Sequence, residues 1–212
     1  MNGGNIMYGS TAALRAVVFD MGGVLMTFDG LFFAQQYTDS DEDAHLLAGA
    51  YFGRREWSLL DAGVIAVPTM ERIAQAHLPE RLHPNLHACA AEWQRYSRPI
   101  EPTNRLALRL KDEGLKVYLL SNASTEIDKQ LNHCPAYQVM DGRVVSGFER
   151  LMKPDPAIYT LLCDRYGLDP ASCLFIDDNQ DNCRGAEVAG MRAFHFTGDA
   201  DALAAFIDGL PR

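Results

Sequence analysis

Short runs rich in β-branched and aromatic residues predict four β-strands, at residues 17–19, 116–120, 173–176 and 192–196. Continuous apolar runs of this kind are typical of strands that are buried on both faces of a sheet. Helical patterns lie between and after these strands, at residues 103–114, 156–166, 182–189 and 199–209. Strands that alternate with helices predict right-handed crossovers, so we expect an α/β fold with a doubly wound parallel sheet.

An Asp-Gly pair at residues 141 and 142 separates two further short stretches, residues 138–140 and 143–145. Asp-Gly between such stretches is typical of a tight turn that joins neighbouring strands. We therefore expect a small hairpin, or a turn between strands, in this part of the chain.

Residues 29–99 have a different pattern, without a convincing strand. Helical segments are predicted at residues 31–37, 41–52, 54–62, 69–76 and 84–96. About seventy residues without a strand are too many for an ordinary loop between a strand and a helix. We predict an inserted all-helical cap domain here, over the carboxyl ends of the strands. The catalytic core would then comprise residues 13–28 and 100–212, preceded by a flexible leader at residues 1–12.

Composition narrows the class of protein further. The 212 residues suit one large domain, or a core with a smaller insertion, and the formal net charge of −9 argues against nucleic acid and anionic membranes as partners. No apolar run approaches the roughly 20 residues that a membrane span needs. The five scattered cysteines and the lack of a signal-peptide pattern predict a cytoplasmic protein with reduced thiols. Nothing in the sequence indicates the oligomeric state.

Polar side chains gather where the predicted strands end. Asp20 follows the first strand, Ser121 and Asn122 the second, and Asp177 and Asp178 the third, with Lys153 in a proline-rich loop between them. The carboxyl ends of parallel strands meet at the edge of the sheet where such folds bind ligands. Acids on separate strand ends can hold Mg²⁺, and a hydroxyl, an amide and a lysine can bind a phosphoryl group.

Taken singly, each of these residues has an ordinary structural explanation. An acid after a strand is often a helix cap, Ser121 alone is typical of a turn, and a lysine before a proline is usually solvated. The order of the sites along the chain is what favours chemistry. We take Asp20 as the nucleophile, because aspartate is an established covalent catalyst of phosphoryl transfer and Gly22 and Gly23 let the backbone approach a ligand.

Four segments in order resemble the motifs of the haloacid dehalogenase superfamily of hydrolases. They are FDMGGVL at residues 19–25, LSN at 120–122, KPDPAIY at 153–159 and FIDDNQDN at 175–182. The resemblance extends from about residue 13 onward, and the helical insertion corresponds to the family's cap between the first and second motifs. Within the family the chain is most similar to the phosphatase-type subgroup that includes glucose-1-phosphate phosphatases and the N-terminal domains of soluble epoxide hydrolases.

The resemblance implies a two-step hydrolysis of a small phosphorylated metabolite. Asp20 would form an aspartyl-phosphate, Lys153 would bridge nucleophile and phosphate, and Ser121 and Asn122 would bind the phosphoryl group. The implied cofactor is Mg²⁺, and its expected ligands are the Asp20 carboxylate, the Gly22 carbonyl and Asp178. Asp177 and Asn182 would support this metal site.

Gly22 is the departure from the family pattern. Typical phosphatases of the family carry a second Asp two residues after the nucleophile, which protonates the leaving oxygen and later activates water. General acid–base help of this kind contributes roughly 10²–10⁴-fold to a rate. Asp29 or a cap carboxylate would be the substitute. Three hypotheses follow: a Mg²⁺-dependent phosphatase, a 2-haloacid dehalogenase that needs neither metal nor acid, and a catalytically weak phosphate-binding or interaction module.

Substrate selectivity is expected to come from the insertion. Arg54, Arg55 and Trp57 form a cluster around Glu56, in which an arginine would bind a second anion and the indole would stack on a ring. The structural alternative is a solvated charged helix face with one half-buried tryptophan.

Overall fold

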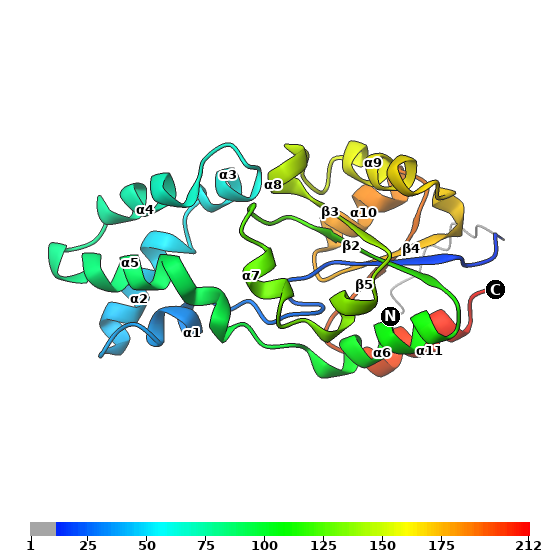
Figure 1. Cartoon of the computed structure of the whole chain (residues 1–212), viewed down its shortest axis with the longest axis horizontal. Helices are drawn as coiled ribbons and strands as arrows, with labels where there is room; N and C mark the ends of the chain where they lie inside the picture. The colour runs from blue at the N-terminus through cyan, green and yellow to red at the C-terminus, as the bar shows by residue number, and fades with distance from the viewer. Residues whose placement is uncertain (1–11) are drawn as a thin grey trace, which may run out of the picture.

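A five-stranded parallel sheet forms one half of the molecule in the computed structural model, which describes residues 12–212 (Figure 1). Its strand order is β3-β2-β1-β4-β5, and every neighbouring pair is parallel. The strands are β1 (Ala16–Phe19), β2 (Lys116–Ser121), β3 (Gly142–Val145), β4 (Cys173–Asp177) and β5 (Arg192–His195). The predicted leader lies outside the described residues apart from Ala12.

Helices cover both faces of the sheet, as expected for a doubly wound fold. They are α6 (Glu101–Asp112), α7 (Asp128–Leu131), α8 (Ser146–Glu149), α9 (Pro156–Tyr166), α10 (Gln180–Val188) and α11 (Ala200–Asp208), with a 3₁₀ turn η4 (Pro170–Ser172). Val17 and Phe19 of β1 pack with α6 and α11, whereas Ala16 and Val18 pack with α9 and α10. Alternate residues of one strand thus enter two apolar layers, which explains why β1 is apolar throughout.

The predicted hairpin is wrong. Residues 138–140 fall in or next to the 3₁₀ helix η3 (Pro135–Val139), and residues 143–145 belong to β3, which pairs in parallel with β2. Asp141 is the physical reason. Its carboxylate accepts a hydrogen bond from the backbone N–H of Val117 at 2.9 Å and so anchors the chain at the start of β2 instead of closing a two-residue turn.

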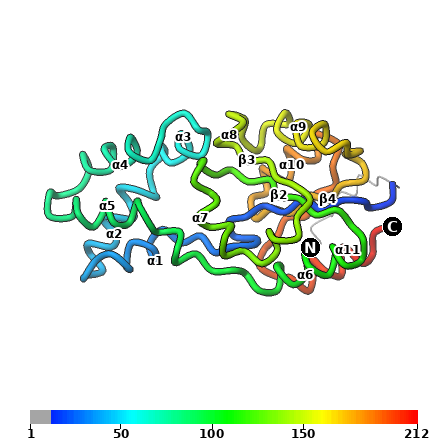
Figure 2. Tube along the Cα trace, in the orientation of Figure 1, coloured from blue at the N-terminus to red at the C-terminus, as the bar shows by residue number. Residues whose placement is uncertain are grey.

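Residues 30–96, called the helical lobe below, lie between β1 and β2 and contain no strand among the described residues. They form α1 (Gly30–Gln35), α2 (Asp41–Tyr51), α3 (Trp57–Asp61), α4 (Val67–Gln75), η1 (Glu80–Leu82), α5 (His83–Glu92) and η2 (Trp93–Tyr96). The lobe has an apolar core of its own, which includes Phe33, Tyr51 and Leu86. Figures 1 and 2 show it beside the carboxyl ends of the strands.

No helix in the described part of the chain is long and apolar enough to cross a bilayer. The five cysteines are all buried and unpaired with one another in disulfides.

Candidate active site

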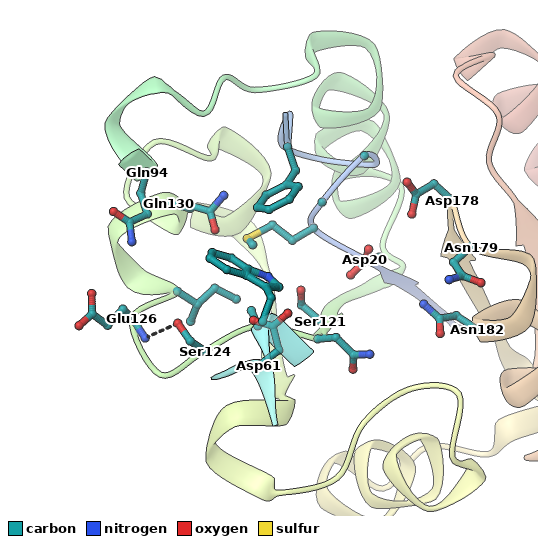
Figure 3. Close-up of a pocket in the computed structure, with 18 of the residues that line it drawn as sticks. Asp20, Asp61, Gln94, Ser121, Ser124, Glu126, Gln130, Asp178, Asn179 and Asn182 are labelled. Atoms are coloured by element: carbon teal, nitrogen blue, oxygen red, sulfur yellow. Dashed lines mark hydrogen bonds between the residues drawn. The ribbon is translucent and has the colours of Figure 1, made fainter. Parts of the chain in front are cut away.

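Asp20 lies directly after β1, in a cavity of about 430 Å³ between the sheet edge and the helical lobe (Figure 3). Its backbone N–H donates to Ile176 in β4 at 2.9 Å, so the strand ladder holds the residue in place. The residue is buried, with 8% of its surface exposed. The parallel sheet therefore presents one nearly desolvated carboxylate to the cavity.

Lys153 joins the ends of β1 and β4. Its ammonium donates to Asp20 Oδ1 at 2.7 Å, to Asp177 Oδ2 at 2.6 Å and to the Leu120 carbonyl at 3.0 Å. These three acceptors match the three donors of a lysine. Only 1% of its side chain is exposed. The lysine is therefore a buried, fully hydrogen-bonded residue of the site and not a surface residue.

Asn122 fixes the loop that carries this lysine. Its side-chain oxygen accepts from the Lys153 backbone N–H at 2.9 Å, and its side-chain N–H donates to the Lys153 carbonyl at 2.9 Å. Both amide groups are thereby used. The structure shows Asn122 lining the cavity while it positions Lys153, and Ser121 beside it at the end of β2 is also buried.

The charges of this cluster do not balance. Burial raises the pKa of Asp20 to about 6, against the lowering influence of Lys153, and Asp177 raises it further. Burial alone would lower the pKa of Lys153, but the two carboxylates outweigh it and the pKa is raised. One ammonium thus faces two buried carboxylates, and Asp178 adds a third at the cavity. Such a cluster favours the binding of a cation.

The donor set fits a hard divalent metal ion. Asp20, Asp177 and Asp178 each offer a carboxylate oxygen, and these oxygens lie within 4.8 Å of one another. Both carboxylate oxygens of Asp177 already accept hydrogen bonds. Asn182 donates to them at 3.0 and 3.1 Å, and Lys153 donates to one of them as well. Asp20 and Asp178 line the cavity and Asp177 does not. This arrangement suits Mg²⁺, which prefers oxygen ligands and few carboxylates.

Gly23 is required where the β1 loop passes Asp178. Its φ is +71°, in the left-handed region that favours glycine. An ideal Cβ at this residue would lie 2.2 Å from a carboxylate oxygen of Asp178. Any side chain there would displace the acid that follows β4.

We expect Gly23→Ala to lower Mg²⁺ affinity roughly ten- to hundredfold, by moving the Asp178 carboxylate away from Asp20. The matched control is Gly114→Ala, whose φ is +89° but whose Cβ would meet nothing within 4 Å. Both variants carry the backbone strain of about 1–2 kcal/mol. Titration calorimetry with Mg²⁺ distinguishes them, and equal affinities in the two variants would show that Asp178 is not a ligand.

The cavity has an acidic and amide side and an aromatic wall. Phe28, Trp57 and Trp93 line the wall, and Phe28 lies 5.8 Å from Trp57 and 5.5 Å from Trp93 between ring centroids. Figure 3 shows Ser121, Asp61 and Asp178 among the polar side chains around Asp20. The cavity therefore offers a charged end for a phosphoryl group and an apolar end for an organic group.

The structure brings most of the predicted residues to this cavity. Those among its lining are Asp20, Gly22, Ser121, Asn122, Asp178, Asn182 and Trp57, while Lys153 and Asp177 lie directly behind it. Arg54 and Arg55 do not line it, which corrects the prediction for the cluster. The Arg54 guanidinium is paired with Glu56 at 3.0 Å, and the Arg55 side chain is 93% exposed.

Sequence reasoning missed several polar residues of the cavity, namely Asp61, Gln94, Ser124, Glu126, Gln130 and Asn179. Asp61 is the one of chemical interest. It is the last residue of α3 and lines the cavity together with Asp20. No motif marks it, since an acid at the end of a short helix is ordinary. The turn glycine at residue 63 is the only nearby signal, and it indicates a change of chain direction rather than chemistry.

The fold and the strand-end cluster agree with a comparison to family models. A model described as haloacid dehalogenase-like hydrolase matches residues 14–190. The chain belongs to this family. As a haloacid dehalogenase-like hydrolase it is an enzyme, and phosphatases are among its relatives.

Two similar proteins carry phosphatase names. Phosphatase MT3486 of Mycobacterium tuberculosis (strain CDC 1551 / Oshkosh) is 28% identical over 197 residues, which cover 86% of this chain and 87% of that protein. Sesquiterpene phosphatase astK of Aspergillus oryzae (strain ATCC 42149 / RIB 40) is 26% identical over 193 residues, with coverages of 90% and 92%.

A solved structure shows the same fold. The L-2-haloacid dehalogenase RSc1362 superimposes with a TM-score of 0.74 at 20% identity, covering 93% of this chain and all of that one. At this identity the likeness establishes the architecture and does not choose between dehalogenase and phosphatase chemistry.

Proposed function

We propose that the protein is a Mg²⁺-dependent phosphatase that hydrolyses a small phosphorylated compound through an aspartyl-phosphate on Asp20. The observation that carries the proposal is the contact of Lys153 with both Asp20 and Asp177, directly behind a cavity that Asp20 and Asp178 line and that is wide enough for a ligand. A buried nucleophile with a fixed ammonium and a cation site is suited to anionic substrates.

The residues divide the work as follows. The Asp20 carboxylate attacks phosphorus, and the bond to the leaving oxygen breaks. The Lys153 ammonium holds the Asp20 carboxylate in place and offsets negative charge, and the Ser121 hydroxyl donates to the phosphoryl oxygens. Mg²⁺ held by Asp20, the Gly22 carbonyl and Asp178 would neutralise the remaining charge. Water then attacks the phosphorus of the aspartyl-phosphate and releases Asp20.

The dehalogenase hypothesis is the alternative for the same nucleophile. Attack on carbon with loss of halide needs neither a metal nor a leaving-group acid, and Gly22 is compatible with it. Three carboxylates within 4.8 Å of one another are a costly arrangement in a site that binds no cation. The acidic cluster therefore supports the phosphatase.

The aromatic wall supports a substrate with an apolar or aromatic organic group. Phe28, Trp57 and Trp93 present ring faces and edges, and the arginines that were expected to bind a second anion lie elsewhere. Among the relatives, the Aspergillus oryzae protein is named for a sesquiterpene, which is a hydrocarbon group. We propose monophosphates of this chemical class over sugar phosphates.

Phe28→Ala is expected to raise KM for an aryl phosphate about tenfold, because roughly 1.4 kcal/mol of apolar contact is lost. The KM for acetyl phosphate should change much less, because its two-carbon group offers little apolar surface to the wall. Phe32→Ala is the matched control, since Phe32 is 40% exposed and lies outside the cavity lining. Equal KM values for the aryl phosphate in the two variants would contradict the assignment of the wall.

The activity itself is tested by a screen of apolar, aryl and sugar phosphates with and without Mg²⁺, beside a 2-haloacid without metal. The proposal predicts phosphate release that depends on Mg²⁺ and is lost in Asp20→Asn. Halide release without metal, and no phosphate release from any compound, would decide for the dehalogenase. If neither phosphate nor halide is released, the third hypothesis, a phosphate-binding or interaction module, is favoured.

A further inference from the structure

The position of the missing acid is open space in this protein. An ideal Cβ at Gly22 would meet only the Phe28 side chain, at 3.8 Å, which is an ordinary contact. The backbone there does not require glycine, since its φ is not positive. A carboxylate is therefore absent at residue 22 without a structural reason, and an alkyl leaving group still needs a proton from somewhere.

We propose that Asp61, supplied by the helical lobe, is the general acid and base of the hydrolysis in place of a carboxylate at position 22. This inference rests on the proposed phosphatase function. It assigns a catalytic role to a residue outside the four family motifs.

The turn that carries Asp61 is docked onto the strand-end loops of the core. The Asp61 carbonyl accepts from Ser146 Oγ at 2.6 Å, and the same hydroxyl oxygen accepts from the Ala123 N–H at 3.0 Å. Gly63 has a φ of +67°, and an ideal Cβ there would lie 2.2 Å from the Gly147 carbonyl oxygen. The lobe thus reaches the core by backbone contact at this turn, and the position of Asp61 relative to the site is defined.

The carboxyl group of Asp61 points to the cavity that contains Asp20 (Figure 3). The Ser124 backbone N–H and the Trp57 side chain donate to it. Trp57 therefore orients this acid in addition to forming the aromatic wall. Two fixed donors hold the group in one orientation, as a proton donor in a reaction requires.

The charges around Asp61 keep a proton available. The ion pairs found among residues 12–212 include none with Asp61, and the other acids of the cavity are Asp20, Asp178 and Glu126. Burial raises the pKa of Asp61 to about 7, and the negative charge of Asp20 adds to the effect. A carboxyl group with a pKa near neutrality can both give and take a proton under ordinary conditions.

Two other acids near the site are already in use. The Asp29 carboxylate accepts from the backbone N–H groups of Leu31 and Phe32, each at 3.0 Å, so it caps α1 and is not among the cavity lining. Glu126 accepts from the Lys129 ammonium at 2.6 Å. The sequence leaves Asp29 and a carboxylate of the helical lobe as substitutes for an acid at residue 22. Because Asp29 is used to cap α1, the geometry favours the lobe carboxylate, Asp61.

The proton balance closes over one turnover. As Asp20 bonds to phosphorus, the electron pair of the broken bond goes to the leaving oxygen, which takes the proton of Asp61 and departs as an alcohol. The Asp61 carboxylate then takes a proton from the attacking water. The phosphorus–Asp20 bond breaks, so that inorganic phosphate leaves with Asp20 and protonated Asp61 restored.

The test compares two substrates of similar shape whose leaving groups differ in their need for a proton. Benzyl phosphate releases a basic alkoxide, and para-nitrophenyl phosphate releases a stable phenolate. We expect Asp61→Asn to slow benzyl phosphate turnover about 10²–10⁴-fold, and to change the first step with para-nitrophenyl phosphate less than about tenfold. With that substrate the lost base should produce a burst of phenolate equal to the enzyme present, followed by slow turnover.

Asp29→Asn is the matched control, because asparagine also caps helices and the residue is outside the cavity. It should behave as the unmodified enzyme with both substrates. Gly22→Asp added to Asp61→Asn should restore benzyl phosphate turnover at least tenfold, since residue 22 has room for a carboxylate. Unchanged benzyl phosphate turnover in Asp61→Asn, or an equal loss of the first step with both substrates, would overturn the role. An unmodified enzyme that releases no phosphate from any compound would instead refute the proposed function.

Discussion

Replacing Asp20 by asparagine is expected to reduce phosphate release on the order of 10⁴-fold or more, which is the scale of loss when a nucleophile is removed. The physical reason is that the carboxylate held 2.7 Å from the Lys153 ammonium is the group that bonds to phosphorus. Steady-state kinetics with an aryl phosphate and saturating Mg²⁺ measure the effect. Activity in Asp20→Asn equal to that of the unmodified enzyme would exclude this nucleophile.

The same substitution should stabilise the metal-free protein. The pKa of Asp20 in the folded protein is about 6, above its ordinary value of 3.8. The protonated group therefore contributes stability that is complete below pH 3.8 and is lost as the pH rises through 6. At pH 8 the ionised carboxylate costs on the order of 3 kcal/mol, which asparagine avoids. At pH 8 without metal, the melting temperature of Asp20→Asn should be higher than that of the unmodified protein. A lower melting temperature would contradict the conclusion that the site carries excess negative charge.

Replacing Lys153 by methionine is expected to lower the free energy of unfolding by about 3–5 kcal/mol, because it leaves Asp20 and Asp177 buried without their counter-charge. Phosphate release should fall at least about 10²-fold, as when one fixed electrostatic donor is removed. Urea unfolding of the metal-free protein measures the first effect. Mg²⁺ should restore part of the stability, since it supplies positive charge to the same carboxylates.

Lys111→Met is the control for Lys153→Met. Lys111 pairs with Asp141 at 2.7 Å, but its side chain is 31% exposed and Asp141 keeps Lys116 as a second partner. A loss of less than about 1 kcal/mol is expected there. Equal losses in the two variants would mean that burial of the strand-end cluster does not set its energetics.

The parallel sheet was predictable because its strands are apolar on both faces, and β1, β2 and β4 carry that pattern plainly. β3 was not, since its Asp-Gly start is a turn signal in isolation. The outcome depends on the Asp141 carboxylate reaching Val117, a contact between segments that are 24 residues apart in the chain. The local sequence predicts a hairpin turn, but a tertiary hydrogen bond places the segment in a parallel strand instead.

The candidate site, too, could be predicted from the sequence only in part. Asp20 and Asp178 follow strands, so their convergence follows from topology alone. Lys153 has the local features of a solvated residue, and only the family motif pointed to its place beside Asp20. Asp61 has neither a motif nor a strand end. Its relation to the site depends on how the turn at Gly63 docks onto the core, which no local pattern encodes.

The most direct test of the central claim is to trap the covalent intermediate. The enzyme is mixed with para-nitrophenyl phosphate and Mg²⁺, quenched in acid within the first turnover, and its peptides are analysed by mass spectrometry. Covalent catalysis by Asp20 predicts one added phosphoryl group on the peptide that contains Asp20, enriched in Asp61→Asn because hydrolysis of the intermediate is slowed. Phosphate release by the unmodified enzyme with no phosphoryl group on that peptide in either protein would contradict it.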